Sequence, residues 1–264
     1  MSIDVHEVHE TLRTDGVALL PGVASAALVC SLRDALAGLR AEARPMSKQV
    51  LYVDGPEPPD RPPLTALMDQ WLSPHSIEGP GSTAPAASAL RPLIEDLLPG
   101  AVLFQDLMLV KQPGQKPFPW HQDYPYWPVD RPDGLVVWLP LTPTDSDSGA
   151  LRFARGSHRL GPRPVVDLHD GRPQDAASDL GFDAADYEWL VPRYEVGDAV
   201  VFLPTTFHGS PATKRNGERA AWSSIWLDPS CRWSHTNAPN HPLCRVVEDG
   251  APVGSISLAG SANR

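Results

Sequence analysis

The sequence predicts a mainly β protein with helices, in which a helical N-terminal part packs on an antiparallel barrel or jelly roll. Three observations favour this fold class. Apolar residues recur at helical spacing in the N-terminal part, β-rich runs separated by turn residues begin near residue 100, and no flexible linker separates the two parts. We therefore expect residues 1–264 to form one domain, with helices over about 1–100, a barrel over about 101–230 and an irregular C-terminal tail.

Helical patterning is concentrated in the N-terminal part. The second predicted helix carries four leucines at helical spacing and follows Ser25, a residue type that often caps a helix N-terminus. A short strand is expected between the first two helices, from Gly16 to Leu20. The predicted helices cover residues 4–14, 25–43, 64–72 and 86–98.

Strand patterning dominates the rest of the chain. The predicted strands are Ala101–Val110, Gly134–Leu141, Leu151–Ala154, Ala199–Pro204 and Arg219–Leu227. They are separated by turn residues, most clearly at Asp145–Gly149 and Asn216–Gly217. The proline-rich residues 45–63 and the insertion 161–192 lack strong strand patterning, and both are candidate lids because long loops in compact domains are often functional.

Composition argues against several classes of protein. The net charge is −10 and Lys and Arg form no cluster, so nucleic acid is not an expected partner. No run approaches the roughly 18 apolar residues of a membrane helix, and the acidic N-terminal segment is unlike a signal peptide. Three cysteines without paired spacing suit a reducing compartment. We expect a cytoplasmic protein that acts on a small molecule, whereas its oligomeric state stays open.

The motif Trp120-His121-Gln122-Asp123 carries the strongest chemical signal. On an extended strand His121 and Asp123 would point to the same face, and His208, at the end of a distant apolar run, could complete a two-His-one-carboxylate set. Such a set leaves positions open for a co-substrate and O₂ and is typical of non-haem Fe(II) oxygenases. Arg219, eleven positions after His208, would supply a cation for a dicarboxylate co-substrate.

Four groups of residues resemble the phytanoyl-CoA dioxygenase family. They are Lys111-Gln112-Pro113-Gly114; Trp120-His121-Gln122-Asp123; Gly149-Ala150-Leu151-Arg152-Phe153 with Gly156-Ser157-His158-Arg159; and His208-Gly209-Ser210 with Arg219. The resemblance spans about residues 15 to 230. It implies a double-stranded β-helix, which is a jelly-roll barrel, and an oxygenase that uses Fe(II), 2-oxoglutarate and O₂.

By matching position, the resemblance implies that His121, Asp123 and His208 bind iron. Arg219 would pair with the C5 carboxylate of 2-oxoglutarate in a bidentate contact that lysine makes less well, and Ser210 would add a hydroxyl. Related halogenases have a small residue in place of Asp123, so the carboxylate argues against halogenation.

Three further residues are candidates for the co-substrate site. Trp138 lies where family members often place an aromatic residue against 2-oxoglutarate, although a core tryptophan is the alternative. Gln105 and Lys111 share one face of the strand before the metal motif and could touch the co-substrate. A solvated lysine at the sheet edge is the alternative for Lys111.

Substrate contacts are expected near the metal motif. Tyr124, Tyr126 and Trp127 follow it directly and suit an apolar, ring-bearing or cationic small molecule, although they could instead pack against the loop prolines. Tyr52, within the proline-rich segment, and Arg152, after a barrel strand, are further candidates. The expected reaction is hydroxylation of a small metabolite, such as one of specialised biosynthesis; desaturation, epoxidation and ring closure stay open.

Other histidines are expected to serve structure. His158 belongs to a segment that forms a structural turn in the family, so it is not an expected ligand. His235 and His241 lie near Cys231 and Cys244, but these spacings match no standard zinc pattern, and polar tail residues are expected instead.

Two functions of other classes remain open. The first is a metal-dependent enzyme on the same barrel that does not use 2-oxoglutarate, in which Arg219 and Ser210 would be structural. The second is a catalytically silent binding module that retains the barrel, which has no need for three buried metal ligands.

Overall fold

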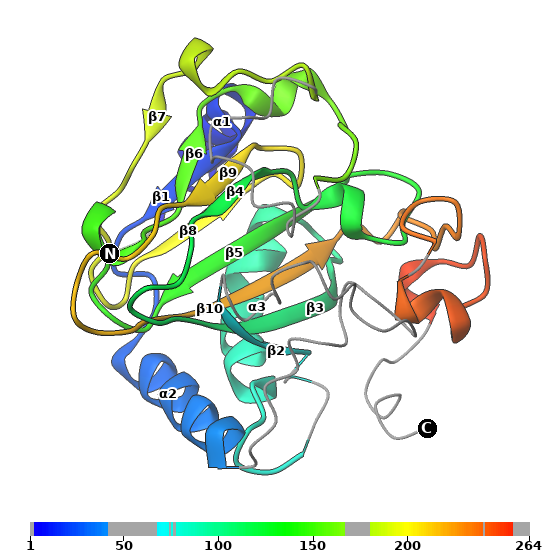
Figure 1. The fold of residues 1–264 in the computed structure, drawn as a ribbon. Coiled ribbons are helices and arrows are strands. Elements are labelled where there is room, and N and C mark those ends of the chain that lie inside the picture. The colour runs from blue at the N-terminus through cyan, green and yellow to red at the C-terminus, as the bar shows by residue number, and fades with distance from the viewer. Residues whose placement is uncertain are drawn as a thin grey trace, which may run out of the picture.

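Two antiparallel sheets form the centre of the computed structural model, which describes residues 3–41, 68–73, 75, 78–166, 180–239 and 241–255. The large sheet contains, in spatial order, β1 (Val17–Leu20), β8 (Ala199–Phe202), β5 (Gly134–Pro140), β10 (Arg219–Leu227), β3 (Val102–Lys111) and β2 (Asp69–Leu72). The small sheet contains β4 (Phe118–His121), β9 (His208–Ser210), β6 (Arg152–Ala154) and β7 (Trp189–Leu190). Figure 1 labels the strands of both sheets, and an apolar side-chain cluster contains residues from each sheet. This two-sheet arrangement confirms the predicted jelly roll.

Three helices cover the outer face of the large sheet. They are α1 (Val5–Asp15), α2 (Ala26–Ala41) and α3 (Ala84–Leu97), and α3 lies behind that sheet in Figure 1. Their apolar side chains share one cluster with outward-facing side chains of the sheet, including Trp222. Local chemistry sets the ends of α1, because the Asp4 carboxylate accepts hydrogen bonds at its start and Gly16 ends it with a left-handed φ of 76°. The predicted helices at 4–14, 25–43 and 86–98 are therefore confirmed in their described parts.

The helix expected over 64–72 is wrong in its described part, because residues 69–72 form β2. This strand pairs antiparallel with β3, placing Trp71 opposite Met108 and Gln70 opposite Leu109. Trp71 is buried against the helices, and Gln70 faces the interior between the sheets. The segment therefore follows the two-residue period of a strand, and pairing with β3 decides its structure.

A β-bulge interrupts the regular alternation of β3 and β10. Ile225 lies opposite Gln105, but the next residue, Trp226, lies opposite Leu103, so Phe104 is the extra residue. Trp226 packs in the outer cluster, whereas Ile225 and Phe104 both pack in the inner cluster. The bulge therefore places Phe104 and Gln105, which are adjacent in sequence, on the inner side of the barrel.

The C-terminal segment 228–255 packs on the barrel. It contains two short 3₁₀ helices, η8 (Pro242–Arg245) and η9 (Val253–Ser255). Trp233 is 1% exposed and forms a β-bridge with Val129, in the segment that follows β4. The Asn237 side-chain amide donates a hydrogen bond to the carbonyl oxygen of Trp127 at 2.6 Å. The irregular tail expected from the sequence is thus part of the packed interior.

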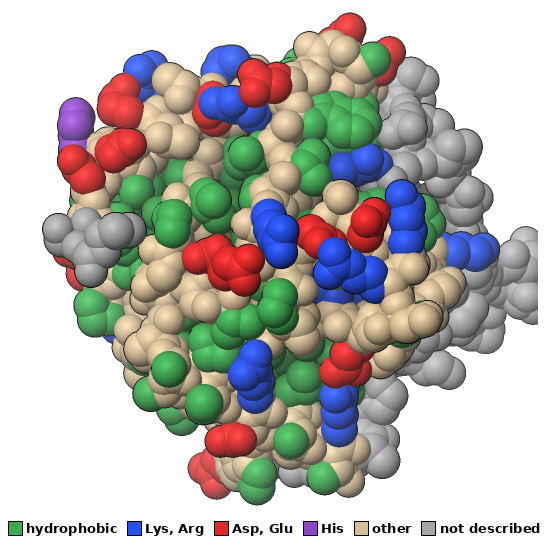
Figure 2. Space-filling model, turned by 90° about the vertical axis from the view of Figure 1, so that its left-hand side faces the viewer, with side chains coloured by type: hydrophobic (Ala, Val, Ile, Leu, Met, Phe, Trp, Pro, Cys, Tyr) green, Lys and Arg blue, Asp and Glu red, His purple; other side chains and the backbone are tan. Residues whose placement is uncertain are grey.

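Charges of both signs are mixed on the face shown in Figure 2, where Lys and Arg side chains lie beside Asp and Glu side chains. A phosphate backbone would instead need clustered cations. No helix within the described ranges is long and apolar enough to cross a membrane.

The first candidate lid, residues 45–63 with Tyr52, lies entirely outside the described residues. The middle of the insertion, 167–179, also lies outside them. The described end of the insertion contains β7, a short edge strand that the sequence pattern does not single out.

Candidate metal centre

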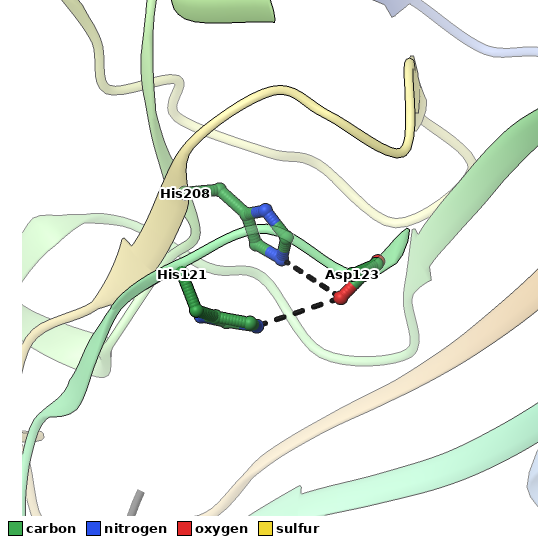
Figure 3. A group of neighbouring side chains, drawn as sticks. All are labelled: His121, Asp123 and His208. Atoms are coloured by element: carbon green, nitrogen blue, oxygen red, sulfur yellow. Dashed lines mark ion pairs between the residues drawn. The ribbon is translucent and has the colours of Figure 1, made fainter. Parts of the chain in front are cut away.

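Three side chains meet where β4 and β9 pair (Figure 3). His121 is the last residue of β4 and lies directly opposite His208, the first residue of β9. Asp123 is not on the strand, because the chain turns after His121 and Asp123 adopts a helical conformation (φ −77°, ψ −39°) before the 3₁₀ helix η3 (Tyr124–Tyr126). The expectation of one extended strand through His121 and Asp123 is therefore wrong, and a turn brings the carboxylate to the two rings.

The polar atoms of the three side chains lie close together. The Nε2 atoms of His121 and His208 each lie 3.5 Å from Oδ1 of Asp123. One ligand atom from each residue lies within 4.8 Å of the other two, and the ring centroids are 4.2 Å apart. Among the described residues, no other three His, Cys, Asp or Glu side chains come this close together.

Hydrogen bonds on the far side of each ring orient the two imidazoles. Nδ1 of His121 lies 2.9 Å from the carbonyl oxygen of Pro119, and Nδ1 of His208 lies 3.0 Å from that of Thr206. Because a carbonyl oxygen can only accept, Nδ1 carries the proton and donates it. A neutral imidazole then presents the lone pair of Nε2 to the Asp123 carboxylate. Three electron-rich atoms meet at one point, an arrangement that fits a bound cation.

Electrostatics favour the same protonation states. Burial, helped by the nearby His121, lowers the pKa of His208 to about 4, so this imidazole is neutral at pH 7. Burial alone would raise the pKa of Asp123, but the two histidines outweigh it and the pKa is lowered. The site therefore combines the neutral imidazole of His208 with an ionised carboxylate, and metal binding requires both protonation states.

Two buried cations lie at the start of β10 and the end of β3. Arg219 and Lys111 are paired across these strands and are 1% and 0% exposed. Among the described residues, Nε and Nη2 of Arg219 have no hydrogen-bond partner, and its guanidinium lies 5.6 Å from the ring centroid of Trp138. Nζ of Lys111 donates to the carbonyl oxygen of Lys116 at 2.8 Å and to the Ser210 hydroxyl at 3.3 Å.

No carboxylate of the described chain pairs with either cation. Burial lowers the pKa of both side chains. Desolvation, with a smaller contribution from Arg219, lowers the pKa of Lys111 to about 7. Desolvation also lowers the pKa of Arg219 to about 10, although Tyr194 opposes this. Buried charges are normally paired, because removing a lone ion from water is costly. These side chains therefore provide a site for an anion.

A cavity of about 140 Å³ connects the metal-binding group to the basic end. This volume is large enough for more than a single water molecule. Four of the predicted co-substrate residues line it: Gln105, Trp138, Ser210 and Arg219. Lys111 does not line the cavity, but its Nζ donates a hydrogen bond to the hydroxyl of Ser210, which does. The structure thus brings the predicted metal and co-substrate residues together around one space.

The predicted aromatic substrate residues divide into two groups. Tyr126 and Trp127 line the cavity, and the Tyr126 hydroxyl donates to the carbonyl oxygen of Val166 at 2.7 Å. Tyr124 does not line it; this side chain is buried, with its hydroxyl 3.4 Å from the carbonyl oxygen of Val129. Helical geometry in η3 turns neighbouring side chains in different directions, which separates Tyr124 from Tyr126.

Arg152 does not line the cavity. Its guanidinium lies 5.1 Å from the ring of Trp120 and 4.7 Å from the ring of Trp189, so it is held between two aromatic faces. The contact joins β6 to β4 and β7. Its geometry indicates a structural contact and does not favour the anionic-substrate contact expected from the sequence.

Several lining residues were not predicted from the sequence. They include Met68, Gln70, Phe118, Ser223, Ile225 and His241. The two-residue period from Arg219 along β10 could have found Ser223 and Ile225. His241 was expected to be a polar tail residue, but it is 9% exposed and lines the cavity. No local pattern reveals this position, because the C-terminal segment reaches the barrel only through tertiary packing.

Comparisons with known proteins agree with this architecture. Residues 12–221 match the model of the family described as phytanoyl-CoA dioxygenase (PhyH). The peroxisomal phytanoyl-CoA dioxygenase of Bos taurus is 31% identical over 144 residues, which are 50% of this chain and 41% of that protein. The chain thus matches about two-fifths of the length of this curated relative.

Solved structures share the fold over nearly the whole chain. The α-ketoglutarate-dependent carbocyclase SnoK from nogalamycin biosynthesis superposes with a TM-score of 0.73 at 19% identity, covering 96% of this chain and 94% of that chain. The epimerase SnoN in complex with Fe³⁺, α-ketoglutarate and nogalamycin RO has a TM-score of 0.70 at 19% identity, covering 94% of each chain. Together with the family match, the fold and the site show that this chain belongs to the phytanoyl-CoA dioxygenase (PhyH) family.

Proposed function

We propose that this protein is a non-haem Fe(II)/2-oxoglutarate-dependent dioxygenase. One observation carries the proposal: a buried guanidinium without an anionic partner in the described chain shares a cavity with two imidazole nitrogens and a carboxylate that converge on one point. The first group suits a carboxylate ligand, and the second suits a divalent metal. Membership of the PhyH family supports the same activity.

His121, Asp123 and His208 would hold the iron. Two nitrogen ligands and one carboxylate on one face match the donor set of Fe(II) oxygenases, and the backbone carbonyls behind the rings keep Nε2 directed at the metal. When bound together, Fe(II) and 2-oxoglutarate supply O₂ activation, coupled to formation of succinate and CO₂ and to oxidation of a substrate C–H bond. The surrounding apolar and aromatic side chains would exclude water from this chemistry.

Arg219 and Ser210 would hold the distal carboxylate of 2-oxoglutarate, and Trp138 would support the guanidinium plane. Lys111 would add positive charge through its contact with Ser210. His208 and Ser210 are two residues apart on β9, a separation of about 7 Å along a strand. A five-carbon diacid can span this distance, with one end at the metal and the other at Arg219.

The proposed reaction is hydroxylation of an unactivated C–H bond in a small-molecule metabolite. Tyr126 and Trp127 are the aromatic residues of the cavity that come directly after the metal-binding motif, so they are the best placed to contact a substrate. Because the solved relatives with this fold include enzymes of nogalamycin biosynthesis, a metabolite of specialised biosynthesis is the proposed substrate class.

An anaerobic titration tests the proposal without a substrate. Fe(II) and then 2-oxoglutarate are added to metal-free protein, and the visible spectrum is recorded. We expect the weak charge-transfer band of a chelated 2-oxo acid, and we expect its loss at the same 2-oxoglutarate concentration in Arg219→Ala. Arg40→Ala, which removes an exposed ion pair with Glu218, is the matched control and should keep the band.

The other outcomes separate the alternatives. Iron binding without a band would overturn the 2-oxoglutarate assignment and favour a metal-dependent enzyme with another co-substrate. Failure to bind iron would overturn the enzyme assignment and favour a silent binding module.

A further inference from the structure

A second group of polar side chains lines the cavity, and it is uncharged. Gln105, Ser223 and His241 are 5%, 6% and 9% exposed. Within the described residues, the side chains of Gln105 and Ser223 have no hydrogen-bond partner. Buried polar groups normally find partners, because an unmade hydrogen bond is costly. Polar groups of largely buried residues that face a cavity and have no partner among the described residues are therefore free to bind a ligand.

The position of Gln105 separates this group from the basic end. Gln105 lies opposite Ile225, which is six residues after Arg219 on β10. Six residues of a strand span about 20 Å. This separation of the two backbone positions exceeds the roughly 7 Å between His208 and Ser210 that the diacid would span. Gln105 is therefore better placed for a second molecule than for the co-substrate contact expected from the sequence.

His241 presents a hydrogen-bond donor at the cavity. It precedes η8, and its Nδ1 accepts a hydrogen bond from the backbone N–H of Leu243 at 3.2 Å. An accepting Nδ1 is unprotonated, so the neutral ring carries its proton on Nε2. No acceptor for this Nε2–H occurs among the described residues. Burial lowers the pKa of His241 to about 4, which is consistent with a neutral ring.

Packing holds the His241 ring in place. Its centroid lies 6.0 Å from that of Phe104, the bulge residue next to Gln105. Phe104 also packs against Trp127 and Trp233, with centroid distances of 5.8 and 5.9 Å. Strand β3, the segment after the metal motif and the C-terminal segment thus meet at Phe104. A donor fixed by three parts of the chain is preorganised for recognition.

We propose that His241 is a substrate-recognition residue whose Nε2–H donates a hydrogen bond to a neutral acceptor oxygen of the substrate, with Gln105 as a second polar contact. The proposal rests on the proposed function, because it assigns this end of the cavity to the molecule that is oxidised. A carbonyl, ether or hydroxyl oxygen fits here. Arg219 is the cation that lines the cavity in the described chain, and it lies at the other end, so an anionic group would have no partner here.

Matched probes test the proposal without the natural substrate. Acetophenone and ethylbenzene have similar shapes, but only the first carries a neutral acceptor oxygen; benzoate carries an anion. Dissociation constants are measured by calorimetry in the presence of Fe(II) and 2-oxoglutarate without O₂. We expect acetophenone to bind more tightly than ethylbenzene or benzoate. In His241→Phe, which keeps a ring and removes the donor, its affinity should fall about three- to tenfold, the usual effect of one neutral hydrogen bond.

A second variant separates recognition from capping of η8. His241→Asn keeps a favoured capping residue for the Leu243 N–H but shortens the side chain, so it should weaken acetophenone binding in the same way. The proposal is overturned if acetophenone binds no tighter than ethylbenzene, if benzoate binds best, or if His241→Asn restores the wild-type preference that His241→Phe has lost.

The absorption band of the iron and 2-oxoglutarate complex is recorded in the same samples. A retained band with a weakened preference for acetophenone supports the assignment of His241 to the substrate. If the wild type shows no band, the proposed function fails, whereas the probe titrations on metal-free protein still decide the role of His241.

Discussion

Two buried charges on the paired strands β3 and β10 lie in opposite environments. Asp106 points to the outer face, where its carboxylate accepts hydrogen bonds from Trp222 Nε1 at 2.7 Å, His75 Nδ1 at 2.6 Å and the Thr83 hydroxyl. Arg219 points to the inner face, where two of its nitrogens have no partner in the part of the chain that the structure describes. The same sheet therefore contains one buried charge with hydrogen-bond partners in the protein and one whose partners the described residues do not supply.

The difference separates structural from functional burial. The partners of Asp106 tie the region between β2 and α3 to the sheet, so this carboxylate is part of the fold. Arg219 faces a cavity instead, where an external anion can complete its hydrogen bonds. Replacing the first should affect stability, and replacing the second should affect ligand binding.

The largest effect is expected from Asp123→Ala at the metal-binding group. Residues that merely support a metal ligand change activity by about 10- to 100-fold, so loss of a ligand should lower succinate formation by more than about 100-fold. Iron content and succinate release from 2-oxoglutarate are the measurements. Near-normal succinate release would contradict the ligand assignment. Asp130→Asn, in the same segment but outside the metal-binding group, is the control.

Arg219→Ala should weaken 2-oxoglutarate binding by about 30-fold or more, because truncating one partner of a buried charge pair costs roughly 2–5 kcal/mol. The affinity of Arg219→Lys for 2-oxoglutarate should lie between those of the wild type and Arg219→Ala, since lysine keeps the charge but loses the bidentate geometry. The unfolding midpoint should change little, because the described residues supply no anion to this guanidinium. An unchanged affinity for 2-oxoglutarate would place its anchor elsewhere.

Asp106→Ala should lower the free energy of unfolding by about 2–3 kcal/mol, because four donors, those of Thr83 and Trp222 fully buried, lose their acceptor. Urea unfolding measures the change. The affinity of the folded fraction for 2-oxoglutarate should stay at the wild-type value. Asp147→Ala, which removes an exposed ion pair with Lys214, should change stability by less than about 1 kcal/mol. Equal losses in the two variants would show that the Asp106 network is not specifically stabilising.

The smallest effect is a pH dependence of 2-oxoglutarate binding. Burial lowers the pKa of Lys111 to about 7, so this side chain is charged below pH 7 and loses its charge above it. Because the charged form favours an anion, the affinity should fall as the pH rises from about 6 to 8. Titrations at several pH values in wild type and Lys111→Met test this. A pH dependence that persists in the variant would assign it to another group.

Sequence reasoning found the residues whose chemistry is uncommon, and it missed those whose position depends on packing. His121, Asp123, His208 and Arg219 could be selected because their types and order are specific. The turn that carries Asp123 was not visible, since a strand of four residues has no pattern that shows where it ends. The helix predicted over 64–72 is wrong in its described part, because pairing with β3, and not local propensity, sets the structure of this edge strand.

The sequence by itself determined the barrel, the covering helices and the chemical identity of the metal and anion sites, because hydrophobic periodicity and side-chain chemistry are local properties. Only the tertiary structure decided which polar residues share the cavity. In the folded chain Arg152 lies between two tryptophans, and His241 of the C-terminal segment lines the cavity. Gln105 lies far from Arg219 along the paired strands. These positions depend on contacts between segments distant in sequence, and strand register and packing fix such contacts.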